Sequence, residues 1–171
     1  MTEKYVYKNQ QIQELMNEIH FLTGSIVHSV QKLEYKLALL VSLKRITHWY
    51  KKNEDTIDHK ELLNKAIRKS EKLFANLNHQ SFGILVRNAI IANILDKSEQ
   101  RELHELVEKR NFLVHNYYKK LIFDMEDKNI IQILKKDLIS LKNVFSLSRR
   151  WYLRIKEKWI DATQQYSQEI K

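Results

Sequence analysis

The chain has 171 residues, a length that suits one domain with a hydrophobic core and is short for two. It contains no proline, no cysteine and only two glycines. So few turn-forming residues disfavour a many-stranded fold, and the lack of cysteine excludes disulfides, thiolate zinc sites and cysteine nucleophiles. The formal net charge of +9 favours an anionic partner, with nucleic acid ahead of anionic lipid.

The spacing of apolar residues predicts five helices separated by short polar segments. They span about 11–49, 58–77, 81–95, 99–122 and 130 into the 160s. Ser81 and Ser98 stand where helix N-caps are expected. After Asp161 the chain is polar, and a tail from about residue 162 is expected to fray. These features predict a single all-α domain over residues 1–171, an up-and-down bundle of about five helices.

Several site types find no support in the chain. The N-terminus lacks a secretory pattern and no apolar run is long enough for a membrane span, so a cytoplasmic protein with no membrane partner is expected. Phosphate-binding glycine loops and serine nucleophile elbows are missing from the sequence. The segment from His104 to Glu108 begins like a zinc-binding helix, but Glu108 stands where the second histidine must be. No metal or cofactor is predicted.

The stretch that begins at Arg110 breaks the hydrophobic pattern of the fourth helix. Arg110 occupies the same stripe as Leu106 and Leu113, where a guanidinium needs a carboxylate, a phosphate or a polar interface. On a regular helix His115 lies about 140° further round than Arg110, whereas Asn111 and His115 share a face. One interpretation is structural: Arg110 pairs with a buried acid, and Asn111 and His115 make local hydrogen bonds.

The acid for such a structural pair is suggested by the first helix. Glu34 is isolated in its apolar part and is the candidate partner of Arg110. Ion-pair networks of this kind also place charges at unusual positions, so both the structural and the functional interpretation remain open at this point.

The segment 110–117 (Arg-Asn-Phe-Leu-Val-His-Asn-Tyr) resembles the Arg-x4–6-His motif of the HEPN domains, with arginine, a polar residue, three mainly apolar residues and histidine. The segment 81–85 (Ser-Phe-Gly-Ile-Leu) is similar to the short aromatic–glycine segment that opens a helix ahead of the motif in many relatives. The similarity in helix layout covers most of the chain.

The resemblance implies a helical bundle that pairs as a homodimer and cuts RNA without a metal ion, leaving a cyclic phosphate. Arg110 would then hold the scissile phosphate, and His115 would act as general acid or base. Asn111 would orient His115 or the phosphate. The nucleophile would be the 2′-hydroxyl of the substrate. Because Arg110 and His115 point apart on one helix, a site assembled across a two-fold axis is expected.

Tyr117 completes an Arg-x4-His-x-Tyr form. In some toxin relatives a partner nucleotidyltransferase silences the toxin by adding nucleotide to this tyrosine, so the resemblance implies a modification or supporting role and an antitoxin partner. Other HEPN proteins are non-catalytic. The alternative function is therefore a module that binds RNA, nucleotide or protein, and a structural partner in a larger assembly is a third hypothesis.

The last predicted helix is strongly basic. Between residues 135 and 158 it holds eight basic and two acidic residues. Its tryptophans follow the core stripe, with Trp151 and Trp159 at helical spacing, and are predicted to pack inside. The cations off that stripe are the predicted RNA contacts: Arg149, Arg150, Arg154 and Lys158.

Overall fold

The computed structural model describes residues 10–169, and every secondary-structure element in that range is helical. In chain order these are α1 (Gln10–Asn53), α2 (His59–Asn78), α3 (Phe82–Ile91), α4 (Lys97–Phe112), the π-helical turn η1 (Leu113–Tyr117), α5 (Tyr118–Asp124) and α6 (Ile130–Glu169). The predicted all-α class is confirmed. Within this range no helix is long and apolar enough to cross a membrane.

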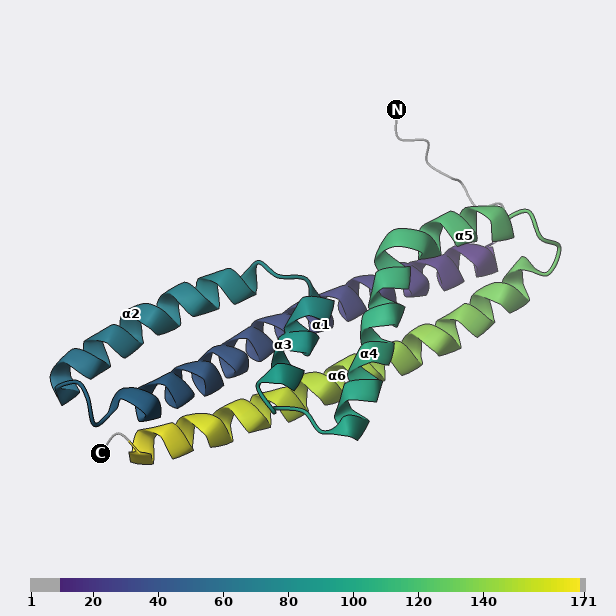
Figure 1. The fold of residues 1–171 in the computed structure, drawn as a ribbon. Coiled ribbons are helices and arrows are strands. Elements are labelled where there is room, and N and C mark those ends of the chain that lie inside the picture. Colours follow the sequence, from purple (N-terminus) through teal and green to yellow (C-terminus); the bar gives the residue numbers. More distant parts are fainter. Residues whose placement is uncertain (1–9, 170–171) are drawn as a thin grey trace.

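Two long helices, α1 and α6, run side by side in the same direction through the whole molecule (Figure 1). Near their beginnings Lys142 Nζ lies 2.8 Å from Glu18 Oε1, and near their ends the rings of Tyr50 and Tyr166 are 6.4 Å apart. The predicted core stripe of α6 faces this partner, with Trp151 only 1% exposed. The two stripes therefore bury each other along about forty residues, which explains why both helices are long.

The helix α2 turns back against the C-terminal half of α1 (Figure 1). Asp58 caps its first turn by accepting hydrogen bonds from the backbone N–H groups of Lys60 and Glu61. A small separate core holds this tip of the molecule together: Ile46, Tyr50, Leu62 and Ala66. The helix begins one residue after its predicted start at Asp58.

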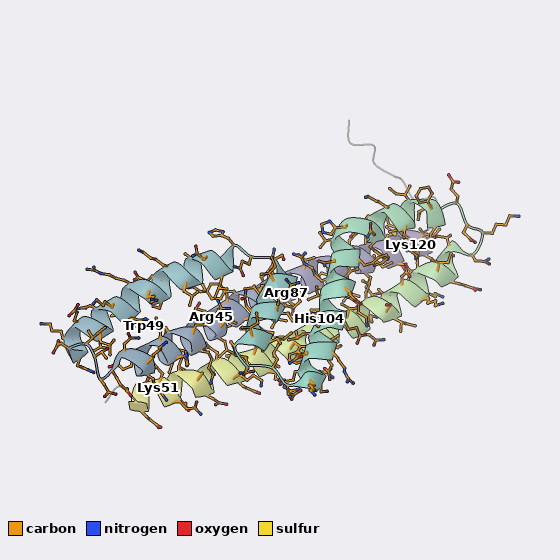
Figure 2. The ribbon with its side chains drawn as sticks, in the orientation of Figure 1. Arg45, Trp49, Lys51, Arg87, His104 and Lys120 are labelled. Atoms are coloured by element: carbon orange, nitrogen blue, oxygen red, sulfur yellow. The ribbon has the colours of Figure 1, made fainter. Side chains whose placement is uncertain are left out.

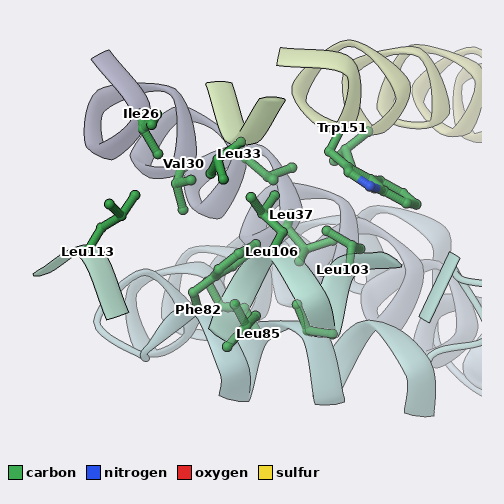
Figure 3. Close-up of a cluster of buried hydrophobic side chains, with 14 of the residues drawn as sticks. Ile26, Val30, Leu33, Leu37, Phe82, Leu85, Leu103, Leu106, Leu113 and Trp151 are labelled. Carbon is green, nitrogen blue, oxygen red and sulfur yellow. The ribbon is translucent and has the colours of Figure 1, made fainter. Parts of the chain in front are cut away.

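The main core lies where α3 and α4 pack onto the α1–α6 pair (Figure 3). Side chains from four helices and from η1 meet there: Val30, Leu33, Leu37, Phe82, Leu85, Leu103, Leu106, Leu113 and Trp151. Full burial of one such side chain contributes about 1.5–3 kcal/mol. This cluster fixes α4 against α1, and it thereby fixes the position of the motif at the end of α4.

The N-cap of α4 differs from the predicted cap at Ser98. Asp96 is the N-cap, and its side chain accepts hydrogen bonds from the backbone N–H groups of Ser98 and Glu99. Glu99 completes a capping box, since its side chain accepts from the N–H of Asp96 at 2.8 Å. Ser98 is not the cap, because a serine at that position already lies within the first helical turn.

The helix α3 ends at Ile91 rather than at the predicted Leu95. Asn93 has a φ of 53°, in the left-handed region that asparagine tolerates better than most residues and that breaks an α-helix. Ile94 and Leu95 are still buried, at 7% and 6% exposure. Their apolar character therefore reflects packing in the connection and not helical structure.

The segments α4, η1 and α5 form one continuous helical rod that changes direction at the π turn (Figure 1). The rod reaches Asp124, close to the predicted end at Ile122. A π turn is a recognised cause of helix bending. In Figure 1 α4 crosses over the α1–α6 pair and α5 then runs along it, so the architecture is less regular than the predicted up-and-down bundle.

The last helix continues to Glu169, where the sequence predicted a fraying polar tail from about residue 162. Ala162 is 8% exposed and the Tyr166 ring packs against Tyr50. These two contacts give the polar segment a buried side. The helix is therefore held against the end of α1 despite its polar composition.

Candidate functional site

Arg110 lies in the last turn of α4 and faces α1. Its Nη2 is 3.7 Å from Oε1 of Glu34, the partner that the sequence suggested. The two side chains are 24% and 19% exposed. Burial raises the pKa of Glu34, and the nearby Arg110 guanidinium offsets this only in part. The guanidinium is therefore held in a loose pair with a carboxylate that is costly to ionise.

Asn111 is exposed and accepts a hydrogen bond at its Oδ1 from Arg110 Nη1, at 3.1 Å. The sequence predicted that Asn111 orients either His115 or the phosphate. In the folded chain it contacts the arginine. Its amide and Glu34 together limit where the guanidinium can point.

His115 lies within the π turn and is exposed to solvent. Within residues 10–169 its imidazole makes no hydrogen bond or ion pair. A π turn advances less per residue around the helix axis than an α turn. Position 115 therefore lies nearer to position 110 around the axis than the 140° of a regular helix, although Arg110 faces α1 and His115 faces solvent.

Three exposed apolar side chains lie close to His115 along the rod. Val114, Tyr118 and Ile122 are 45%, 40% and 63% exposed, and they recur at four-residue intervals along the outer side of the rod. The Tyr118 ring also contacts His20 of α1, with a centroid separation of 5.6 Å. We refer to Val114, Tyr118 and Ile122 as the outer strip. Exposed apolar residues clustered beside a polar motif are typical of interaction sites.

Tyr117 points the opposite way, into the protein. It is 3% exposed, and its hydroxyl has no hydrogen-bond partner among the described residues. Burial, and next the nearby Asp137 carboxylate, raise the pKa of Tyr117 far above its ordinary range. This position suits the predicted supporting role, whereas the predicted nucleotide addition would require the hydroxyl to become exposed.

A hollow of about 350 Å³ opens beside Tyr117, between the π turn and α6. Lys120 borders it and lies 3.2 Å from Asp137 and 2.8 Å from Asp124 (Figure 2). The lysine is therefore neutralised by two carboxylates. These ion pairs fix α5 against α6 and leave the hollow without a free cation of its own.

Three of the four predicted RNA-binding cations are engaged by acids of α4. Arg150 lies 2.7 Å from Glu102. Arg154 and Lys158 lie 2.8 Å and 3.1 Å from Glu99, whose side chain is only 2% exposed. A buried carboxylate needs such partners. These cations join α6 to the start of α4, and a role in RNA binding stays a prediction for them.

Arg149 is separated from the other three. It lies on another side of α6, with its guanidinium carbon 5.8 Å from the centre of the Phe145 ring. Within the described part of the chain it forms no ion pair. The four predicted cations thus do not form one patch.

The fold and these residues define an all-helical protein with an Arg–Asn–His group at a π turn. Among residues 10–169, no three His, Asp or Glu side chains are close enough together to hold a metal ion. Comparisons with models of protein families, with curated proteins and with solved structures found no match.

Proposed function

We propose that this chain is a HEPN-type endoribonuclease with an active site completed by a second copy of the chain. The observation that carries the proposal is the arrangement at the π turn, where an exposed, unpaired His115 stands five residues after Arg110. π turns occur frequently at functional sites because they redirect side chains at a cost in helix geometry. The net charge of +9 supports RNA as the substrate.

In the proposed reaction the 2′-hydroxyl oxygen of the RNA attacks the adjacent phosphorus. The bond from phosphorus to the 5′-oxygen breaks, which leaves a 2′,3′-cyclic phosphate and a free 5′-hydroxyl. The 2′-hydroxyl loses a proton and the leaving 5′-oxygen gains one. His115 carries out one of these two transfers, as an imidazole can near neutral pH, and water carries out the other. Arg110 stabilises the negative charge that develops on the phosphoryl oxygens.

Arg110 would have to exchange Glu34 for the phosphate. The separation of 3.7 Å is long for a charge-assisted hydrogen bond, whereas guanidinium–phosphate contacts are typically about 2.7–2.9 Å and often bidentate. The raised pKa of Glu34 also indicates an incompletely compensated carboxylate. A phosphate is therefore a competitive partner for this arginine.

The second copy is required because one chain presents the two groups on different sides. Arg110 faces inward and His115 faces outward beside the outer strip of Val114, Tyr118 and Ile122. Pairing of two such strips about a two-fold axis would bury these apolar side chains and bring His115 of one copy toward the rod of the other. We therefore assign the outer strip to the homodimer contact.

The proposal is tested by incubating single-stranded RNA with the wild type, His115→Ala and Arg110→Ala in excess chelator. Each substitution should reduce cleavage by at least about 10²-fold, the usual contribution of a general acid or base, and the products should carry cyclic phosphates. His104→Ala is the matched control, because His104 is exposed on the same rod. Equal cleavage by His115→Ala and wild type would contradict the mechanism.

Mixing the two inactive variants tests the composite site separately. A dimer of one Arg110→Ala and one His115→Ala chain keeps one complete Arg110–His115 pair if each site takes its residues from different copies. Random re-pairing should then restore about a quarter of the wild-type activity. No restoration, from variants that form mixed dimers, would show that each site belongs to a single chain.

A non-catalytic binding module is the second candidate function. The Arg110–Glu34 pair favours this candidate, because the pair gives Arg110 a structural partner.

As an enzyme, the chain would act on cytoplasmic RNA. It would be the toxin or effector of a toxin–antitoxin or defence system with a nucleotidyltransferase-type antitoxin. Expression in a bacterial host discriminates between the ribonuclease and the binding module. A ribonuclease should arrest growth, and His115→Ala should relieve the arrest. A binding module should be tolerated both as the wild type and as His115→Ala.

A further inference from the structure

A groove runs along the α1–α6 pair. It lies on a different side of α1 from Glu34, the residue that contacts Arg110. It consists of two hollows of about 320 and 300 Å³, which share His28, Lys32 and Tyr152 in their walls and are therefore continuous. Lys32 and Glu34 are two residues apart and so point to nearly opposite sides of α1. The groove is thus distinct from the candidate catalytic site.

The walls of the groove are basic. His28, Lys32 and Lys36 follow one another at four-residue spacing on α1, and Arg149 faces them from α6. No aspartate or glutamate lines either hollow. Within residues 10–169 no carboxylate pairs with Lys32, Lys36 or Arg149, whereas Arg150, Arg154 and Lys158 are all paired. The groove therefore holds several cations and no carboxylate that could neutralise them.

Aromatic rings alternate with these cations. Tyr35 is 47% exposed and Tyr152 is half-buried, and both line the groove. Lys36 Nζ lies 4.0 Å from the centre of the Trp159 ring, which continues the line on α6. Cations spaced along a groove with interleaved aromatic faces suit the repeated phosphates and unstacked bases of a single strand. A rigid duplex would present its phosphates but hide its base faces from these rings.

We propose that this groove binds single-stranded RNA, with Lys32 and Arg149 contacting phosphates and Tyr152 stacking on a base. The choice of RNA over DNA rests on the proposed function, while the groove's chemistry fits either strand. An RNA strand bound here would lie across α1 from the cleavage site. It would hold the substrate to the protein without blocking the π turn.

The experiment measures binding of a fluorescent 12-nucleotide single-stranded RNA by anisotropy. All variants carry His115→Ala, so that binding is read without cleavage. Arg149→Ala is compared with Lys136→Ala, which removes one positive charge from an exposed residue of α6 that lines neither hollow. Arg149→Ala and Lys32→Ala should each weaken binding about three- to tenfold and lower the salt dependence, while Lys136→Ala should change it less than twofold.

Tyr152→Ala separates stacking from charge. It should weaken single-strand binding about tenfold while leaving the salt dependence unchanged. An excess of unlabelled single-stranded RNA should displace the probe more effectively than duplex RNA, and a single-stranded DNA competitor shows whether the ribose contributes. Equal weakening of binding by Arg149→Ala and Lys136→Ala would overturn the proposal. Equally effective displacement of the probe by duplex and single-stranded RNA would also overturn it.

Binding to anionic lipid vesicles is measured as well, because a basic surface also attracts lipid headgroups. Groove-dependent binding to phosphatidylserine vesicles without binding to RNA would overturn the assignment. The outcome is separable from the catalytic proposal. If the wild type cuts no RNA but Arg149→Ala still weakens binding selectively, the groove stands and the ribonuclease proposal fails. If cleavage depends on His115 but Arg149→Ala does not weaken RNA binding, the ribonuclease proposal stands and the groove proposal fails.

Discussion

Arg110 Nη2 lies 3.7 Å from Oε1 of Glu34, so the arginine of the candidate motif faces a carboxylate of its own chain. This contact supports both functional hypotheses, since it can be a structural pair or a resting contact that substrate displaces. The two are separated by what happens when the carboxylate loses its charge.

Glu34→Gln should increase RNA cleavage or phosphate affinity several-fold if Glu34 competes for Arg110, because the neutral amide holds a guanidinium less strongly. If the pair is only structural, activity should remain unchanged or fall. Steady-state kinetics at pH 7 decide between the two. Glu14→Gln, at an exposed glutamate of the same helix, is the control.

The same substitution has a pH-dependent effect on stability. Burial raises the pKa of Glu34 in the folded chain above its ordinary value of 4.5. The folded state therefore binds more protons than the unfolded state as pH rises through this range, and wild-type stability falls. Relative to wild type, Glu34→Gln should gain stability between about pH 4 and pH 7, by less than about 1 kcal/mol because the pair is partly exposed. Urea unfolding at both pH values measures this, and a gain that shrinks with rising pH would contradict it.

Glu99→Ala should destabilise the protein by about 3 kcal/mol. Its buried side chain is the common partner of Arg154 and Lys158 and also completes the capping box of α4. Glu102→Ala, which removes only the exposed partner of Arg150, should cost less than about 1 kcal/mol. Thermal or urea unfolding compares them, and equal losses would show that the buried carboxylate is not a special anchor.

Ile122→Lys should shift the protein from dimer to monomer without unfolding it, because it places a charge in the outer strip. Ile139→Lys is a closely matched control, since both isoleucines are 63% exposed and Ile139 lies on α6. Light scattering after size-exclusion chromatography measures the mass, and circular dichroism monitors the fold. A wild-type monomer, or dissociation by both substitutions, would argue against the assigned interface.

Tyr117→Phe should leave stability unchanged or raise it slightly, since the buried hydroxyl has no hydrogen-bond partner among the described residues. Cleavage should also persist if Tyr117 only supports the turn. A nucleotide adduct formed by a nucleotidyltransferase on the wild type, and lost in Tyr117→Phe but not in Tyr118→Phe, would instead establish the modification role. Intact-mass spectrometry reads the adduct directly.

The sequence predicted what depends on periodicity and composition. The helical class, most helix extents and the burial of Trp151 follow from apolar spacing, and Glu34 was identified as a partner because an isolated acid in an apolar stripe needs one. The capping box at Asp96 and Glu99 was present in the sequence as an acidic cap followed three residues later by glutamate. Choosing Ser98 by residue type alone missed it.

Other features depend on contacts that periodicity does not encode. Pairing of Arg150 and Arg154 with acids some fifty residues away follows from α4 crossing over the α1–α6 pair. The groove cations on α1 had a readable signal in the four-residue spacing of His28, Lys32 and Lys36. This spacing could be interpreted as a groove only once the structure placed Arg149 of α6 opposite these three residues. The π turn left no trace in the hydrophobic pattern, because a helix with one additional residue can still bury both of its ends.

The π turn at Leu113–Tyr117 makes the rod one residue longer than a regular helix covering the same path. If the same residues formed a regular α-helix, everything beyond the turn would rotate by about 100°. Leu121 would leave the core, and Lys120 would leave its two carboxylates. The direction of His115 and the docking of α5 therefore share a single register. The π turn therefore absorbs the additional residue that would otherwise turn α5 away from the core.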